Sequence, residues 1–303
     1  MTGAVPVYRD DVHPPTVAVR EAVAIALAED LLPLGDLSAA LMPEASRGRA
    51  AFVARAQGVV AGTRCVEQTC SQVDPRLEVT WLVGDGCDIG PGGVIGRLEG
   101  PLRSLLTSER TALNFLCHLS GVATAARRYV EVAHGANPSA RIWDTRKTTP
   151  GLRSLEKAAV RAGGAANHRG SLSEGVLIKD NHLGGLSISE AVRKALAWWP
   201  GRMVEVECEH PSQVAEALDA GATLVMCDNM TPDEVRACVE LVRAHPRGVT
   251  GSVLVEASGG VDLENVAAYA RAGADVISVG ALTHSVVALD IGLDLESVTF
   301  GAS

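Results

Sequence analysis

Lysine and aromatic residues are scarce in this chain. Aromatic residues occupy 3% of the 303 positions, and lysine occurs only at Lys147, Lys157, Lys179 and Lys194. Acidic residues outnumber basic ones by 36 to 27, so the composition gives no reason to expect a nucleic acid as a partner. An anionic ligand would need a local basic cluster. A lysine that persists in so arginine-rich a chain is either a functional ammonium group or a chance survivor on the surface.

The sequence shows no C-x-x-C pair, no long apolar run and no leader pattern in its first residues. Its seven cysteines are an odd number without a C-x-x-C pair, and several lie inside apolar runs, which is typical of reduced thiols in the cytoplasm. The first 15 residues contain no basic segment followed by an apolar core, and no stretch of 18 uncharged apolar residues occurs. We therefore expect a cytoplasmic protein that is neither secreted nor inserted in a membrane. Zinc-ligand spacings, G-x-S-x-G and Walker sequences are absent too.

From Arg141 onward, short β-branched runs alternate with amphipathic stretches. The runs cover residues 141–145, 175–178, 203–206, 223–227, 252–255 and 275–279. Helical patterns lie between them, among them 211–220, 231–244 and 261–272. Six such units predict a parallel sheet with covered faces, and their even spacing favours an α/β barrel over an open doubly wound sheet.

The N-terminal part has a different pattern. A helix is predicted over 16–32, and short strands are predicted at 51–54, 77–83 and 93–99 between glycine turns. A helix from about 105 to 134, continuous or broken near Gly121, would follow. We therefore predict an α/β protein with an N-terminal α+β sandwich domain and a barrel domain. The predicted divisions are 1–118 for the first domain, 119–288 for the barrel, and a tail, 289–303, that returns to the first domain.

Polar residues follow each predicted barrel strand at its carboxyl end, where the active sites of α/β barrels lie. The successive groups are Asp144 to Lys147, Lys179 to His182, Glu205 with Glu207, Asp228 with Asn229, Glu256 to Gly260, and Gly280 with Ala281. All six strands are therefore expected to direct functional groups to one face.

Two of these groups have the composition of a phosphate-binding loop. Ser258-Gly259-Gly260 precedes a predicted helix and lets backbone N–H groups approach an anion, and Gly280-Ala281 supplies the neighbouring loop. The alternative reading of the first loop is a simple tight turn.

Basic residues are concentrated between positions 146 and 179. They are Arg146, Lys147, Arg153, Lys157, Arg161, His168, Arg169 and Lys179. Arginine binds carboxylates bidentately and lysine offers a point charge to phosphate, so this cluster predicts an anion site. The spacing of Arg153, Lys157 and Arg161 favours a solvent-exposed helix stripe for those three. His168 fits a hydrogen-bonded structural residue as well as a ligand-binding one.

Glu207 and Asp228 stand at successive strand ends. Carboxylates in this arrangement suit Mg²⁺, bound directly or through its waters. They equally suit ion pairs with Lys147 and Lys179, and the two arrangements can alternate between ligand states.

Several blocks of the sequence resemble signature segments of quinolinate phosphoribosyltransferases. The central blocks are Thr145 to Arg153, Asn167-His168-Arg169 and Leu177 to His182. Further matches lie at Glu29-Asp30, Gly35-Asp36, Glu109 to Asn114, Ser120-Gly121, Glu256 to Gly260 and Ser278 to Ser285. Chance does not explain so many blocks in the right order over nearly the whole chain.

The resemblance implies a homodimer, or a higher oligomer, with an incomplete α/β barrel and an active site that borrows Arg110 from the partner chain. It implies transfer of a phosphoribosyl group from phosphoribosyl pyrophosphate to quinolinate, with release of pyrophosphate and carbon dioxide, in NAD synthesis. Mg²⁺ is expected with the pyrophosphate, and no organic cofactor.

By the same analogy each residue of the site has an expected role. Quinolinate would contact Arg110, Thr145, Arg146, His168, Arg169 and Lys179. Lys147, Glu207 and Asp228 would face the ribose and magnesium pyrophosphate, and together with Lys179 would form the catalytic group. The 5′-phosphate would lie on Ala257, Ser258, Gly259 and Gly260 and on Val279, Gly280 and Ala281.

Three other functions remain open at this level. A paralogue could act on another pyridine or base, but two arginines beside His168 favour a dicarboxylate. A Schiff-base lyase could use Lys179 as its nucleophile, and the dense arginine cluster argues against it. A phosphate sensor without catalysis is the third, and the presence of Lys147, Glu207 and Asp228 argues against that reading.

Overall fold

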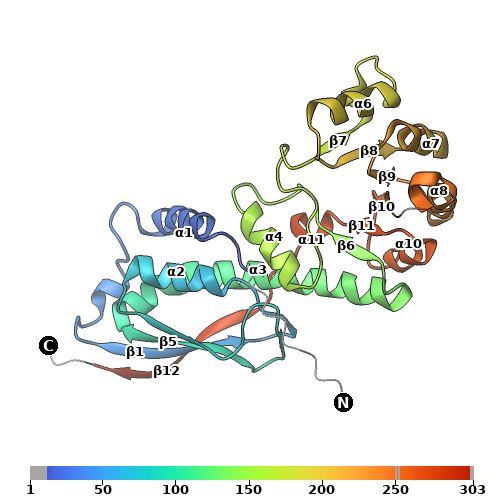
Figure 1. Cartoon of the computed structure of the whole chain (residues 1–303). Coiled ribbons are helices and arrows are strands. Elements are labelled where there is room, and N and C mark those ends of the chain that lie inside the picture. The colour runs from blue at the N-terminus through green and yellow to red at the C-terminus, as the bar shows by residue number, and fades with distance from the viewer. Residues whose placement is uncertain (1–11, 250, 252, 301–303) are drawn as a thin grey trace. The chain divides into compact units, whose positions relative to one another are not determined.

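The computed structural model describes residues 12–249, 251 and 253–300, which form two compact units (Figure 1). The first unit holds the described residues up to 127, residues 149–164 and those from 285 onward; the second holds 128–148 and 165–284. The two units interleave along the chain, and a linear division at residue 118 stays a prediction. Residues 1–11, 250, 252 and 301–303 lie outside the described residues. The prediction that the protein is not secreted rests mainly on residues 1–11 and stays a prediction.

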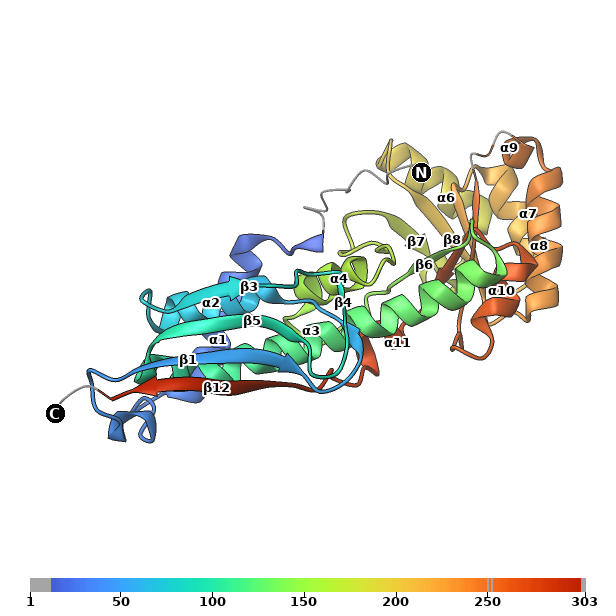
Figure 2. The ribbon, with the colours of Figure 1, turned by 90° about the horizontal axis from the view of Figure 1, so that it is seen from below.

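The first unit is built on a four-stranded antiparallel sheet (Figure 2). Its strand order is β12 (Ile291–Thr299), β1 (Arg47–Ala54), β5 (Val94–Pro101) and β3 (Glu78–Trp81). β12 pairs with β1 from Ile291 opposite Ala54 to Thr299 opposite Arg47, so the end of the chain joins the sheet of the first unit. β2 (Gly58–Val59) and β4 (Asp88–Ile89) form a separate short pair.

Helices complete the first unit. They are α1 (Thr16–Leu31), a 3-10 turn at Ala39–Leu41, α2 (Thr63–Val73), the first part of α3 (Leu102–Ala136), and α4 (Arg153–Ala162). The core of the unit joins Phe52 and Leu98 of the sheet to Val66 of α2 and Leu105 and Leu116 of α3, and all five are almost fully buried. The apolar positions of α3 recur at helical spacing, so burial against the sheet favours one long helix.

The break considered near Gly121 does not occur, and α3 is continuous over 35 residues. Glycine is needed there for space: a Cβ at Gly121 would lie 2.4 Å from the carbonyl oxygen of Val287 and 3.0 Å from Cα of Ala288. The residue marks a close approach of two chain segments, because a glycine inside a helix costs only about 1 kcal/mol and does not break it.

The second unit contains six parallel strands, as the sequence predicts. Their order is β6 (Arg141–Trp143), β11 (Val276–Ser278), β10 (Leu254–Ser258), β9 (Leu224–Asp228), β8 (Val204–Cys208) and β7 (Val176–Ile178). Among the described residues, β6 and β7 do not pair with each other. Ala166 forms an isolated parallel bridge to Trp143, the last residue of β6. The sheet is therefore an incomplete α/β barrel, which confirms the expected fold.

Helices follow the strands of the second unit. They are α5 (Asp180–Leu183), α6 (Ile188–Trp198), α7 (Pro211–Ala220), α8 (Pro232–Ala244), α9 (Pro246–Val249), α10 (Val266–Ala272) and α11 (Ala281–His284). The Thr231 side chain caps α8 by accepting from the N–H of Glu234. Gly221 and Gly273 end α7 and α10 with φ of +109° and +95°, a backbone that glycine adopts without strain. In the described part of the chain, no helix has the length and apolarity needed to cross a bilayer.

Candidate functional site

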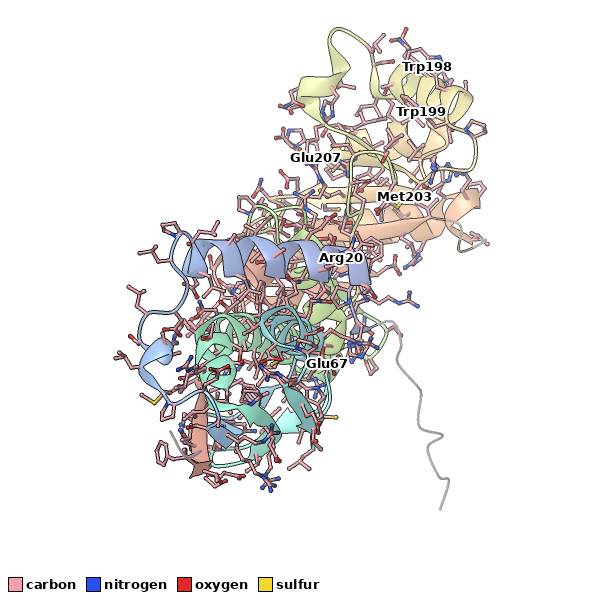
Figure 3. All side chains as sticks on the ribbon, turned by 90° about the vertical axis from the view of Figure 1, so that its left-hand side faces the viewer. Arg20, Glu67, Trp198, Trp199, Met203 and Glu207 are labelled. Atoms are coloured by element: carbon pink, nitrogen blue, oxygen red, sulfur yellow. The ribbon has the colours of Figure 1, made fainter. Side chains whose placement is uncertain are left out.

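A pocket of about 580 Å³ lies at the carboxyl ends of the six parallel strands. Met203 directly precedes β8 and Glu207 lies near its carboxyl end, and of these two residues only Glu207 lines the pocket (Figure 3). Eleven of the predicted site residues line it: Thr145, Arg146, Lys147, His168, Arg169, Lys179, Glu207, Asp228, Ser258, Gly259 and Gly260. The pattern of polar residues after each strand therefore located one real cavity.

The remaining predicted residues do not line this pocket. Ala257 and Val279 are buried within or just after their strands, and Gly280 and Ala281 follow β11. Arg110 is exposed on the part of α3 that belongs to the first unit. Its predicted role depends on a second chain, and that role stays a prediction.

The loop after β6 holds Lys147 beside Gly280. The N–H of Lys147 donates to Oγ1 of Thr145 over 3.0 Å, and its carbonyl oxygen accepts from Oγ1 of Thr283 over 2.7 Å. A Cβ at Gly280 would lie 3.1 Å from Cδ of Lys147 and 2.9 Å from Nε2 of His284. Because Gly280 has no side chain, Lys147 and His284 can both lie against the loop that follows β11. His284 was not predicted as a site residue.

The glycine loop after β10 packs against Asn229. A Cβ at Gly259 would lie 2.3 Å from Oδ1 and 2.8 Å from the backbone nitrogen of Asn229. Gly259 and Gly260 have φ of +91° and +60°, and Asn229 itself has φ of +54°, an uncommon value outside glycine that is often found at functional sites. The helix predicted over 261–272 is present as α10, but it begins at Val266, so the predicted start directly after this loop is wrong. Backbone N–H groups of the loop itself are therefore the available anion donors.

Two of the four residues of the expected catalytic group, Lys147, Lys179, Glu207 and Asp228, pair with each other. The ammonium group of Lys179 forms an ion pair with the Glu207 carboxylate, which was one of the two arrangements considered. Asp228 accepts from Nδ2 of Asn229 over 2.7 Å. Both acids present carboxylate oxygens to the pocket from neighbouring strands, the donor type that Mg²⁺ prefers.

Two arginines supply the pocket with bidentate donors. Nη1 of Arg169 donates to the carbonyl oxygen of Gly175 over 2.8 Å, and burial lowers the pKa of the guanidinium below its usual value. Arg146 is half-buried after β6. Partly desolvated guanidinium groups bind carboxylates more strongly than exposed ones do.

The basic cluster of the sequence divides between the two units. Arg153, Lys157 and Arg161 lie on α4, which belongs to the first unit. The expected solvent-exposed stripe is wrong, since Lys157 is only 6% exposed. Residues 155–160 are all buried, so α4 is enclosed on more than one side, which charge spacing alone does not reveal.

In the wall of the pocket, His168 contacts an aromatic ring, a backbone N–H group and two carboxyl groups. Its ring packs edge-on against Trp143 with the centroids 5.5 Å apart. Nδ1 accepts from the backbone N–H of Arg169 over 2.8 Å. Nε2 lies 3.0 Å from Oε2 of Glu205 and 3.6 Å from Oε2 of Glu256. Because Nδ1 accepts, the proton of a neutral His168 ring resides on Nε2 and faces the two carboxyl groups.

Glu205 and Glu256 are both fully buried. Burial raises the pKa of each carboxyl group to about 8, and the proximity of the two groups adds to the rise at Glu256. Both residues lie at the ends of predicted strands, but no role was predicted for either. A signal was present: Glu205 and Glu207 are two residues apart in β8 and so share one face of the sheet, and the same holds for Glu256 and Ser258 in β10.

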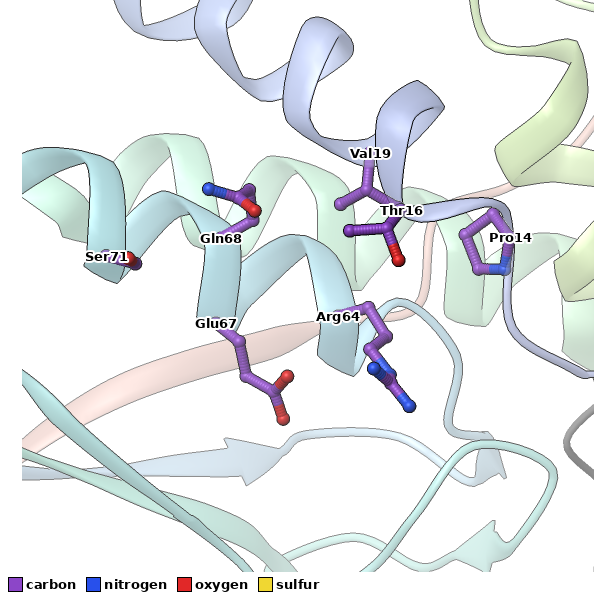
Figure 4. Close-up of a pocket in the computed structure, with 7 residues that line it drawn as sticks. All are labelled: Pro14, Thr16, Val19, Arg64, Glu67, Gln68 and Ser71. Atoms are coloured by element: carbon purple, nitrogen blue, oxygen red, sulfur yellow. The ribbon is translucent and has the colours of Figure 1, made fainter.

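A second, smaller pocket lies in the first unit between α1 and α2, with a volume of about 180 Å³ (Figure 4). Arg64 and Glu67 of α2 and Thr16 at the start of α1 line it. Its single arginine stands near a carboxylate, so it offers no site for a polyanion.

The fold and the larger pocket define a class of protein, a parallel α/β barrel with a basic anion pocket and two carboxylates at its strand ends. Two family descriptions match: "Quinolinate phosphoribosyl transferase, N-terminal domain" over residues 36–120 and "Quinolinate phosphoribosyl transferase, C-terminal domain" over residues 122–294. The chain belongs to the quinolinate phosphoribosyltransferase family.

Named relatives agree with this. A Bacillus subtilis protein called "Probable nicotinate-nucleotide pyrophosphorylase [carboxylating]" is 42% identical over 86% of this chain and 88% of its own length. The human "Nicotinate-nucleotide pyrophosphorylase [carboxylating]" is 39% identical over 85% of each chain. A solved nicotinate-nucleotide pyrophosphorylase from Francisella tularensis superposes with a TM-score of 0.86 at 35% identity, covering 94% of this chain and 98% of the other.

Proposed function

We propose that this chain transfers the phosphoribosyl group of phosphoribosyl pyrophosphate to the nitrogen of quinolinate, with release of pyrophosphate and carbon dioxide. It would serve the synthesis of NAD. The observation that carries the proposal is one pocket that combines two arginines, two lysines, three acidic side chains (Glu207, Asp228 and Glu256) and a glycine loop. Both expected substrates are polyanions, and this pocket concentrates basic side chains in a protein of net charge −9.

The two substrates would occupy different sides of the pocket. Arg146, Arg169 and Lys179 suit the two carboxylates of quinolinate, because guanidinium groups match carboxylates bidentately. Lys147 and the glycine loops after β10 and β11 suit the phosphates, because lysine and backbone N–H groups bind phosphate oxygens. We call these the dicarboxylate half and the phosphate half of the site.

Two physical effects would drive the reaction. The pocket holds the pyridine nitrogen against the anomeric carbon, and its fixed charges stabilise the pyrophosphate as the bond to C1 breaks. The product nitrogen is cationic, so it can accept the electron pair left at C2 when the C2–carboxylate bond breaks. Carbon dioxide then leaves and a proton takes its place at C2.

Glu207 and Asp228 would hold Mg²⁺ together with the pyrophosphate. Their carboxylate oxygens on adjacent strands fit a hard cation, and each now has a cationic or amide partner that a metal could displace. The metal would supply neutralisation of the leaving pyrophosphate charge.

A homodimer would complete the site through Arg110. This residue is exposed on α3 between Thr107 and Thr111, whose hydroxyl groups hydrogen bond to Asp36 and Asp30 over 3.1 and 3.0 Å. The segment that carries these two aspartates also exposes Leu32, Leu34, Leu37 and Leu41, each by 65% or more. So many exposed leucines in one short segment support burial against a second copy of the chain. Seven free cysteines support a reducing compartment such as the cytoplasm.

The test is formation of nicotinate mononucleotide and carbon dioxide from quinolinate, with nicotinate as the control substrate, with and without Mg²⁺. Lys179→Ala and Arg169→Ala should reduce kcat/KM for quinolinate by about 100-fold or more, while Arg236→Ala on the exposed side of α8 should not. Equal turnover of nicotinate, or wild-type turnover in the Lys179 variant, would refute the assignment.

A further inference from the structure

His168 lines the pocket and lies between the backbone of Arg169 and two buried carboxyl groups. Its Nδ1 receives the Arg169 N–H, and its Nε2 faces Glu205 and Glu256. Its own backbone N–H donates to Oδ1 of Asp144 over 2.9 Å. The ring therefore links the two buried carboxyl groups to the backbone of Arg169, whose guanidinium group lines the pocket.

Two buried carboxyl groups are an unfavourable way to stabilise a protein. Each is 0% exposed, and removing a carboxylate from water without full compensation opposes folding. Apolar side chains of similar volume would pack more favourably at these two buried positions. A structural role therefore does not account for two acids here.

We propose that Glu205 and Glu256 are positioning residues, whose carboxyl groups fix the His168 ring and through it the Arg169 backbone, and so shape the dicarboxylate half of the site. This rests on the proposed function. It predicts a specific defect: loss of either acid disturbs the binding of the dicarboxylate and leaves the phosphate half intact.

The experiment compares Glu205→Leu and Glu256→Leu with Glu205→Gln and Glu256→Gln. Glu240→Leu, on the exposed side of α8, is the control. We expect the Leu variants to melt at or above the wild-type temperature, with KM for quinolinate raised about tenfold and KM for phosphoribosyl pyrophosphate within about twofold. The Gln variants keep a polar oxygen close to Nε2 of His168 and should stay within about threefold of wild type in both constants.

A purely structural role would give the opposite pattern, a lower melting temperature with both KM values unchanged, and would overturn the proposal. A parallel rise of both KM values would also overturn it. So would a stoichiometric metal ion that purifies with the wild type and is lost in Glu205→Leu, since the three groups lie close enough to bind one.

A second measurement does not depend on turnover. Nitrogen NMR of the His168 ring in the wild type should show the proton on Nε2 at neutral pH, and the Glu205→Leu ring should exchange between tautomers. A wild-type proton on Nδ1 would contradict the inferred geometry. If the wild type failed to use quinolinate, the proposed function would fall, while the NMR result would still decide whether the two acids fix the ring.

Discussion

The ammonium group of Lys179 pairs with the carboxylate of Glu207 at the ends of the neighbouring strands β7 and β8. A residue of the proposed dicarboxylate half thereby neutralises a proposed metal ligand. One ammonium group cannot fully serve both Glu207 and a substrate carboxylate, so substrate binding competes with this ion pair. The two halves of the site are coupled through Lys179.

We therefore expect Glu207→Gln to bind quinolinate about three- to tenfold more tightly than the wild type when phosphoribosyl pyrophosphate is absent, although turnover falls about 100-fold. The competing carboxylate is gone, so Lys179 is free for the substrate. Isothermal titration of quinolinate measures the affinity. In a Lys179→Met background the same Glu207 change should give no gain, and a gain that persisted there would disprove the competition.

Gly259→Ala should weaken the phosphate half. The new Cβ would meet Asn229 at 2.3 Å and sit at a φ of +91°, so both the loop and Asn229 must move. KM for phosphoribosyl pyrophosphate should rise about tenfold or more, with a stability loss of about 1–3 kcal/mol. Gly201→Ala is the matched control, with a φ of +81° and no atom within 4 Å of the added Cβ. It should share part of the stability loss and leave KM unchanged; a similar KM change in both variants would exclude a role for the loop.

The strand-end residues could be predicted because a parallel sheet brings all of its carboxyl ends to one edge. The alternation of β-branched runs and helices fixes that topology, and the register then places Glu207 beside Met226 and Ser258 beside Asp228. Local sequence was sufficient for this part of the site.

The enclosure of α4 and the buried acids could not be predicted in the same way. The spacing of Lys157 is the same on an exposed helix and on an enclosed one, and only tertiary packing decides between them. The pairing of Glu205 with Glu256 requires contact across β9, between residues 51 positions apart in the sequence. Charge patterns within one segment carry no information on such contacts.

Mixed dimers of two inactive variants test whether Arg110 contributes to the active site of the partner chain. Arg110→Ala and Lys179→Ala should each be almost inactive alone. If Arg110 completes the site of the partner chain, unfolding and refolding the two variants together should restore roughly a quarter of wild-type activity, since half of the dimers would then contain one intact site. A mixture that stays inactive while forming dimers would show that Arg110 acts within its own chain or not at all.

Stability against pH tests the proton held by the buried acids. The folded-state pKa of Glu256 is raised to about 8 from an ordinary value of 4.5, so the folded state binds more protons than the unfolded state between those values. The wild type is therefore stabilised at low pH relative to high pH, and this contribution is lost as the pH rises towards 8.

Glu256→Gln has no titrating group at this position. The free energy of unfolding of this variant, relative to that of the wild type, should therefore increase by about 1–3 kcal/mol between pH 5 and pH 8. The measurement is urea unfolding across that range, with Glu240→Gln as the exposed control, whose difference from the wild type should stay flat. A difference for Glu256→Gln that was equally flat would mean that Glu256 is ionised throughout, and that His168 holds it as a carboxylate.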